Sequence, residues 1–202
     1  DYIPYGCQDI NQKDIDEVVS VLKSEFITQG PITPQFEKAV ASYSKSKFAV
    51  ATNSATSALH IACLALELKA GDIVWTSPIS FAASANCARY CGAEIDFVDI
   101  DSDTFNISIE ALTNKLREAE SRGKLPKIVI PVHFGGSPCA MKEIYILSKK
   151  YGFNIIEDAS HAIGAKLDDH MVGDCYYSDI TVFSFHPVKI ITSGEGGVAC
   201  TN

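Results

Sequence analysis

The sequence has no long apolar run and little positive charge, and each shortage excludes a class of protein. Polar residues interrupt every apolar stretch well before the roughly 18 residues that a membrane-spanning helix needs. The 17 Lys and Arg against 25 Asp and Glu leave a formal charge of -8, which gives no electrostatic support for binding a polyanion. No basic segment followed by apolar residues stands at the N-terminus, so we expect no export signal. Membranes and nucleic acids are therefore not expected among its partners.

The 202 residues include seven cysteines but no C-x-x-C pair. Zinc sites and redox sites ordinarily place two cysteines at that spacing, and the odd number argues against a disulfide framework. Cys87 and Cys91 stand one helical turn apart. That spacing suits metal ligation, but it is more typical of small residues on the buried side of a helix. We therefore expect reduced thiols, a cytoplasmic protein and no metal site.

Short runs rich in Val and Ile alternate with helical segments along most of the chain. The alternation is typical of an α/β fold with three αβα layers, in which helices cover both faces of a mostly parallel sheet. Two helices are expected on the N-terminal side of this alternating region. The first follows an N-cap at Asn11, and the second begins at the Thr33-Pro34 pair. After it we expect a Gly-containing loop region and two strands with a hairpin-like connection, at 178–185 and 196–201. The other expected strands are 48–52, 72–77, 94–100, 127–132 and 154–158, and the helices between them are 54–66, 81–91, 109–122 and 141–151.

In open α/β sheets, ligands bind beyond the carboxyl ends of the strands, so the residues directly after each strand are the candidates for a site. The segment NSATS (53–57) opens a helix whose free N–H groups and dipole would face an anion such as phosphate, although small polar residues also begin many ordinary helices. Asp158 ends an apolar strand, where a carboxylate needs a cationic partner or hydrogen bonds. Lys189 is either a solvated lysine in a turn or an enclosed amine that can attack carbonyls.

An anion pocket, a carboxylate and a lysine with Ser184 nearby match what pyridoxal phosphate (PLP) requires of a protein. The sequence resembles the DegT/StrS family of nucleotide-sugar aminotransferases, which has the fold type I architecture. This resemblance covers essentially the whole chain. It is carried by FITQGP (26–31), NSATSALHIA (53–62), SPISFAASANCARYCGA (77–93), FVDID (97–101), PVHFGG (131–136), IEDASHAIGA (156–165) and SFHPVKIITSGEGG (184–197).

The resemblance implies a role for each candidate residue. Lys189 would form the Schiff base with PLP and move a proton, and Asp158 would pair with the ring nitrogen. The other cofactor-binding residues would be Phe81 stacked on the ring, His161 near its other side, and Ala55, Thr56 and Ser184 around the phosphate.

The resemblance also implies a reaction, in which an amino group passes from glutamate to C4 of a UDP-linked 4-keto-6-deoxy-N-acetylhexosamine. SATSALHIACLAL, SANCARYCGA and SFHPVKIIT are most similar to the aminotransferases of pseudaminic acid biosynthesis. We expect a homodimer, with residues 1–202 forming an N-terminal segment and the large PLP-binding domain, and with the family's smaller C-terminal domain absent. Such a fragment could be inactive alone.

Three alternatives to this reaction stay open at the level of the sequence. The acceptor could be a dTDP-linked ketosugar, or the chain could be a truncated, non-catalytic protein that binds PLP or a partner and regulates. The third alternative is a sugar dehydratase of the same family. Those dehydratases carry histidine in place of the lysine, so Lys189 argues against them.

Overall fold

A single sheet organises the computed structural model, which describes residue 3 and residues 6–202. Its strands are β1 (Phe48–Thr52), β2 (Ile73–Thr76), β3 (Glu94–Phe97), β4 (Ile128–Ile130), β5 (Asn154–Asp158), β8 (Ile180–Ser184) and β9 (Gly197–Thr201). They lie in the order β1-β9-β8-β5-β4-β2-β3. Neighbours from β8 to β3 pair in parallel, whereas β9 runs antiparallel to both β8 and β1. The mostly parallel sheet and the final hairpin-like strand pair are therefore confirmed.

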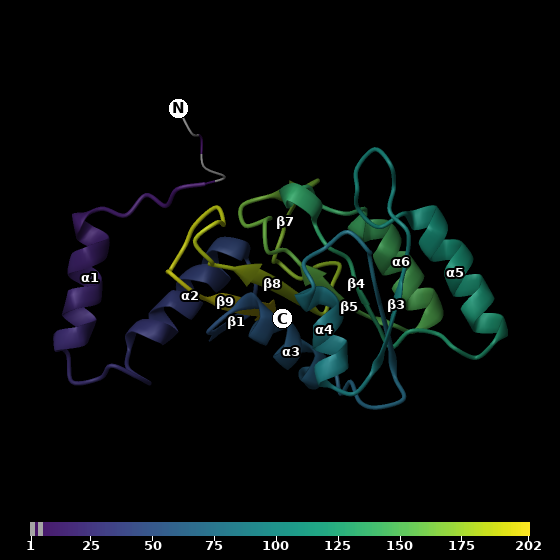
Figure 1. Ribbon diagram of the computed structural model, residues 1–202, viewed down its shortest axis with the longest axis horizontal. Helices are drawn as coiled ribbons and strands as arrows, with labels where there is room; N and C mark the ends of the chain where they lie inside the picture. Colours follow the sequence, from purple (N-terminus) through teal and green to yellow (C-terminus); the bar gives the residue numbers. More distant parts are fainter. Residues whose placement is uncertain (1–2, 4–5) are drawn as a thin grey trace.

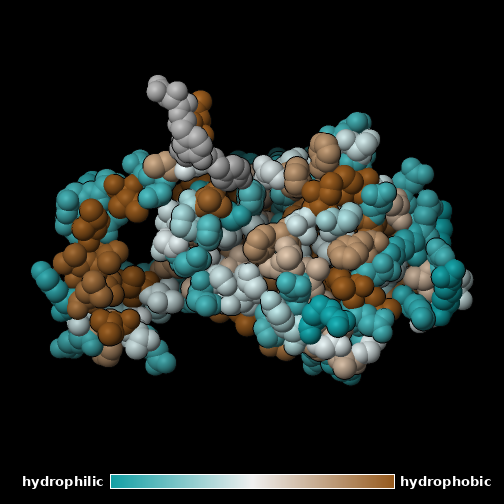
Figure 2. Space-filling model, viewed as in Figure 1, coloured by the Kyte–Doolittle hydropathy of each residue, from teal (hydrophilic) through white to brown (hydrophobic). Residues whose placement is uncertain are grey.

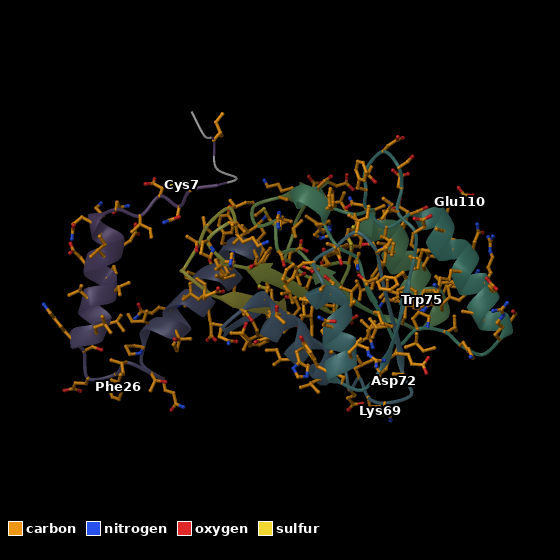
Figure 3. All side chains as sticks on the ribbon, in the orientation of Figure 1. Cys7, Phe26, Lys69, Asp72, Trp75 and Glu110 are labelled. Atoms are coloured by element: carbon orange, nitrogen blue, oxygen red, sulfur yellow. The ribbon has the colours of Figure 1, made fainter. Side chains whose placement is uncertain are left out.

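Strand alternation divides the apolar side chains between the two faces of this sheet. Val74 packs with α3 (Ala55–Ala65) and α4 (Ala83–Tyr90), whereas its neighbour Trp75 packs with α5 (Ile109–Ser121) and α6 (Met141–Tyr151). Figure 3 labels Trp75 beside α5, where Lys115 of that helix lies over its ring at 5.0 Å. A third group of core residues joins α2 (Ile32–Ser44) to β8 and β9. Helices on both faces confirm the expected αβα layers.

The helix α1 (Gln12–Lys23) stands apart from the rest of the chain (Figure 1). Its start is as expected, because Asn11 and Asp14 form a capping box. None of its residues is buried, and Figure 2 shows hydrophobic side chains gathered on it. Those side chains are Ile15, Val18, Val19 and Leu22. Within the described residues, none of the helices combines the length and the apolar character that crossing a membrane requires.

The strands β3 and β4 end earlier than predicted, at Phe97 and Ile130 rather than at 100 and 132, because their ladder pairing stops there. Three further features differ from the predicted elements. The helix α2 begins at Ile32, behind Pro31 and without a side-chain cap, rather than at the Thr33-Pro34 pair. The expected loop region contains a small antiparallel hairpin of β6 (Lys166–Leu167) and β7 (His170–Met171). Two-residue strands are too short to show an alternating pattern, which is why they were missed. A 3-10 turn, η1 (Phe134–Gly136), follows β4 and was likewise not predicted.

Candidate active site

A cavity of about 660 Å³ opens at the carboxyl ends of the parallel strands. Its walls come from the segments that follow β1, β2, β4, β5 and β8, as the rule for open α/β sheets predicts. A second, more open cavity lies near the amino ends of the strands, where Figure 3 labels Lys69 and Asp72, and none of the predicted site residues lines it. The residues predicted to bind PLP all line the first cavity: Ala55, Thr56, Phe81, Asp158, His161, Ser184 and Lys189.

One wall of the cavity is the beginning of α3. The hydroxyl of Ser54 caps this helix by accepting the Ser57 N–H at 3.2 Å, and the N–H groups of the first turn have no acceptor within the helix. Gly197 of β9 lies directly against this turn. A Cβ at Gly197 would lie 2.3–2.4 Å from backbone atoms of Ser54 and Ala55, so only glycine permits the close approach. Because Ser184 pairs with Gly197, its hydroxyl is placed beside a helix start that favours anions.

Asp158 lies at the floor of the cavity and is only 3% exposed. The hydroxyl of Ser84 donates to its Oδ2 at 2.5 Å, and Ser160 donates to Oδ1 through both its N–H at 3.2 Å and its hydroxyl at 2.6 Å. Three hydrogen bonds therefore stabilise the buried charge in place of a bonded cation. Ser84 was missed by the sequence analysis; the signal was a polar residue on the inward side of α4, between the small residues Ala83 and Cys87.

Lys189 and His161 meet inside the cavity, with Nζ and Nε2 2.6 Å apart. Burial lowers the pKa of Lys189, and the nearby charge of Asp158 opposes this only in part. Burial also lowers the pKa of His161, and the charge of Lys189 lowers it further against the opposing effect of Asp158. A neutral His161 can therefore accept a hydrogen bond from Nζ. Lys189 is thus half-buried and lines the cavity, in contact with His161, which favours the enclosed amine over a solvated lysine in a turn.

The rim of the cavity carries Phe81, whose side chain is 76% exposed. Its stacking on a cofactor ring stays a prediction. His186 and Glu195 also line the cavity, with His186 Nε2 3.8 Å from Glu195 Oε1. Neither had been given a role from the sequence, since single polar residues in a loop carry no spacing signal. Within the described part of the chain, His, Cys, Asp and Glu form no group of three or more that could hold a metal ion.

The neighbour of Asp158 along β5 faces the other way. Glu157 is buried and accepts hydrogen bonds from His133 Nε2 at 2.8 Å, Ser178 Oγ at 2.5 Å and Thr181 Oγ1 at 2.8 Å. Burial disfavours the charged form, but these hydrogen bonds hold the pKa of Glu157 below its ordinary value. The two carboxylates lie on opposite faces, as strand alternation predicts, and cannot act as a pair on one substrate.

Comparison with known sequences gives a family for this chain. A sequence model of the DegT/DnrJ/EryC1/StrS aminotransferase family matches residues 8–202. Over 200 residues the chain is 43% identical to a Campylobacter jejuni protein named UDP-4-amino-4,6-dideoxy-N-acetyl-beta-L-altrosamine transaminase, and the match covers 99% of this chain and 51% of that protein. The chain spans about half the length of the curated relatives it matches.

Solved structures with the same fold agree with the sequence comparison. Helicobacter pylori PseC, described as an aminotransferase involved in the biosynthesis of pseudoaminic acid, superposes with a TM-score of 0.91 at 30% identity, over 100% of this chain and 53% of PseC. Spr1654 from Streptococcus pneumoniae in its PLP form superposes with a TM-score of 0.87 at 30% identity, over 99% of this chain and 53% of Spr1654. The predicted fold class and family resemblance are confirmed.

Proposed function

The chain belongs to the DegT/DnrJ/EryC1/StrS aminotransferase family, and from that premise we propose that it forms the PLP-binding part of a nucleotide-sugar aminotransferase. The observation that carries the proposal is the meeting of Lys189, Asp158 and the start of α3 in one cavity. A buried carboxylate, an amine with a lowered pKa and a helix start closed by Gly197 fit the three polar parts of PLP. The PLP form of Spr1654 further supports the choice of cofactor.

Each side of the cavity has its own task in this proposal. The first turn of α3 and the Ser184 hydroxyl bind the phosphate, and Asp158 pairs with the protonated ring nitrogen. When bound, PLP supplies an electron-withdrawing ring that stabilises negative charge on the substrate carbon. Lys189 would hold the cofactor covalently at rest and, once the substrate amine has displaced it from the cofactor, its free amine would move a proton to or from that carbon. His161 lies beside Nζ, with its Nε2 at 2.6 Å, and holds the amine in place by a hydrogen bond.

We extend the proposal to the substrates and the assembly. The amino donor is glutamate, and the acceptor is a UDP-linked 4-keto-6-deoxy-N-acetylhexosamine. The names of the Campylobacter jejuni relatives and of Helicobacter pylori PseC support a pseudaminic acid-type pathway. Residues 1–202 comprise an N-terminal segment and the large PLP-binding domain, working as a homodimer. The seven free cysteines are consistent with a reducing compartment such as the cytoplasm.

Titration of the protein with PLP tests the cofactor assignment directly. The wild type is expected to give the visible absorbance band of PLP bonded to a lysine, and Lys189→Ala is expected to lose it. Lys142→Ala is the matched control, because Lys142 is exposed on α6 and lies outside the cavity. A folded wild type without the band, or a band that survives in Lys189→Ala, would contradict the proposal.

A coupled assay with glutamate then tests turnover and the acceptor. Activity with UDP-linked ketosugars and little with dTDP-linked ones is expected. The reverse preference would replace the acceptor and keep the enzyme class. Binding of PLP without turnover of either acceptor would favour the non-catalytic alternative for this length of chain.

A further inference from the structure

We propose that His133 and Glu157 form a positioning pair that orients Asp158 and the wall beside His161 from the far face of the sheet. The inference rests on the proposed function, because it assigns these residues a task toward PLP that they perform without touching it. Both side chains are buried, with His133 1% and Glu157 5% exposed.

His133 connects three parts of the backbone around the site. Its N–H donates to the Asp158 carbonyl at 3.1 Å, and its ring Nδ1 accepts the Cys139 N–H at 3.1 Å. Since Nδ1 is an acceptor, the ring proton is on Nε2, which donates to Glu157 at 2.8 Å. One imidazole therefore ties the segment after β4 to the end of β5.

Both carboxylate oxygens of Glu157 accept hydrogen bonds. Its Oε2 accepts from His133, and its Oε1 accepts from the hydroxyls of Ser178 and Thr181. Removing a carboxylate from water is costly, and a well-packed apolar group of similar volume commonly gives equal or better stability. A buried carboxylate that accepts three hydrogen bonds is better explained by the geometry that these bonds impose on its partners.

The pair of His133 and Glu157 is connected to the residues of the cavity in two ways. Glu157 and Asp158 share a peptide group, and the Asp158 N–H donates to the Pro131 carbonyl at 2.9 Å, so holding Glu157 limits rotation of Asp158. On the other route, the segment from His133 to Cys139 carries Gly136, which packs on the backbone of His161. A Cβ at Gly136 would lie 2.5 Å from the His161 carbonyl oxygen. Movement of this segment would therefore be transmitted to His161.

Two conservative substitutions of His133 separate its side-chain bonds. His133→Asn keeps an acceptor near the position of Nδ1 for the Cys139 N–H and loses the bond to Glu157. His133→Gln keeps a donor near the position of Nε2 for Glu157 and loses the bond to Cys139. By analogy with outer-shell partners of metal ligands, we expect each variant to weaken PLP binding about tenfold. We also expect a changed ratio of the visible absorbance bands, because Asp158 and His161 no longer meet the ring as before.

A matched control distinguishes positioning from stability. Ser148 is buried on α6, away from the cavity, and donates to the Tyr145 carbonyl at 2.8 Å. Ser148→Ala is expected to lower the melting temperature without changing the Kd for PLP or the spectrum. If the His133 variants behave like Ser148→Ala, the pair is structural only and the inference is wrong.

A milder variant covers the case in which the His133 variants do not fold. Thr181→Val removes one donor to Glu157 and leaves His133 in place, so we expect a twofold to threefold weaker Kd in the same direction, roughly the loss of one modest hydrogen bond. An unchanged Kd and spectrum in folded Thr181→Val would overturn the inference. The outcomes are separable, because a wild type that binds no PLP would overturn the proposed function itself.

Discussion

The two faces of β5 at its carboxyl end use the same chemical group in opposite ways. Glu157 and Asp158 are both buried carboxylates, 5% and 3% exposed. The Glu157 carboxylate is enclosed by His133, Ser178 and Thr181 and does not line the cavity, whereas Asp158 borders the cavity and is held by Ser84 and Ser160. Burial and charge therefore do not identify the residue that meets a ligand. What identifies that residue is whether its carboxylate borders the cavity or is enclosed by protein partners.

The largest effect on stability is expected when the enclosed carboxylate of Glu157 is removed. Glu157→Ala leaves the donors of His133, Ser178 and Thr181 without their acceptor, so we expect a loss of about 3–5 kcal/mol in the free energy of unfolding. Urea unfolding measures it. Glu118→Ala is the control, because its pair with Arg122 is exposed and should contribute less than about 1 kcal/mol. Equal stability of the two variants would remove the distinction between a closed and an open face.

The converse variant on the open face should affect chemistry more than stability. Asp158→Asn keeps the size of the side chain and can still accept from Ser84, but it removes the charge that would hold the ring nitrogen protonated. We expect transamination to fall about 10²-fold or more, which corresponds to about 2.7 kcal/mol. Single-turnover kinetics with glutamate measure it. A transamination rate for Asp158→Asn equal to that of the wild type would contradict the assignment.

A smaller effect is expected from the support of Asp158. Ser84→Ala removes the hydrogen bond to Oδ2, and a bond to a charged group contributes about 1.5–3 kcal/mol. The Kd for PLP is therefore expected to rise at least tenfold, measured by absorbance titration. Ser121→Ala, on the exposed side of α5, should leave the Kd unchanged. A wild-type Kd for Ser84→Ala would show that Asp158 does not need this donor.

The smallest effect is expected from the positive charge of Lys189, which is unfavourable in the half-buried cavity. Because the folded-state pKa of Lys189 is lowered, its charge destabilises the cofactor-free protein at pH values below that pKa. Lys189→Met should therefore melt slightly higher than wild type near neutral pH. The difference should shrink as the pH rises through the lowered value and vanish above the ordinary lysine pKa. Melting curves of the two proteins across pH measure this, and a difference that does not change with pH would contradict the expectation.

Much of the fold follows from local patterns. The strands β1 and β5 and the helix α6 have the predicted bounds, since short apolar runs, helical periodicity and a terminal glycine such as Gly152 can be recognised from neighbouring residues alone. The hairpin of β6 and β7 and the start of α2 were not predicted, because their local signals are weak and contacts with other elements decide them. Ser84 and His133 were likewise given no role, since their partners are 74 and 24 residues away.

The sequence by itself determined that this protein has a layered α/β fold, that Asp158 ends a strand and that Lys189 comes after one, because hydrophobic periodicity depends only on neighbouring residues. Only the tertiary structure decided which carboxylate faces the cavity with its hydroxyl donors, and which is closed behind the sheet. It also decided that Lys189 meets His161. The physical reason is that hydrogen-bond partners and burial depend on segments that meet only when parallel strands bring their carboxyl ends together.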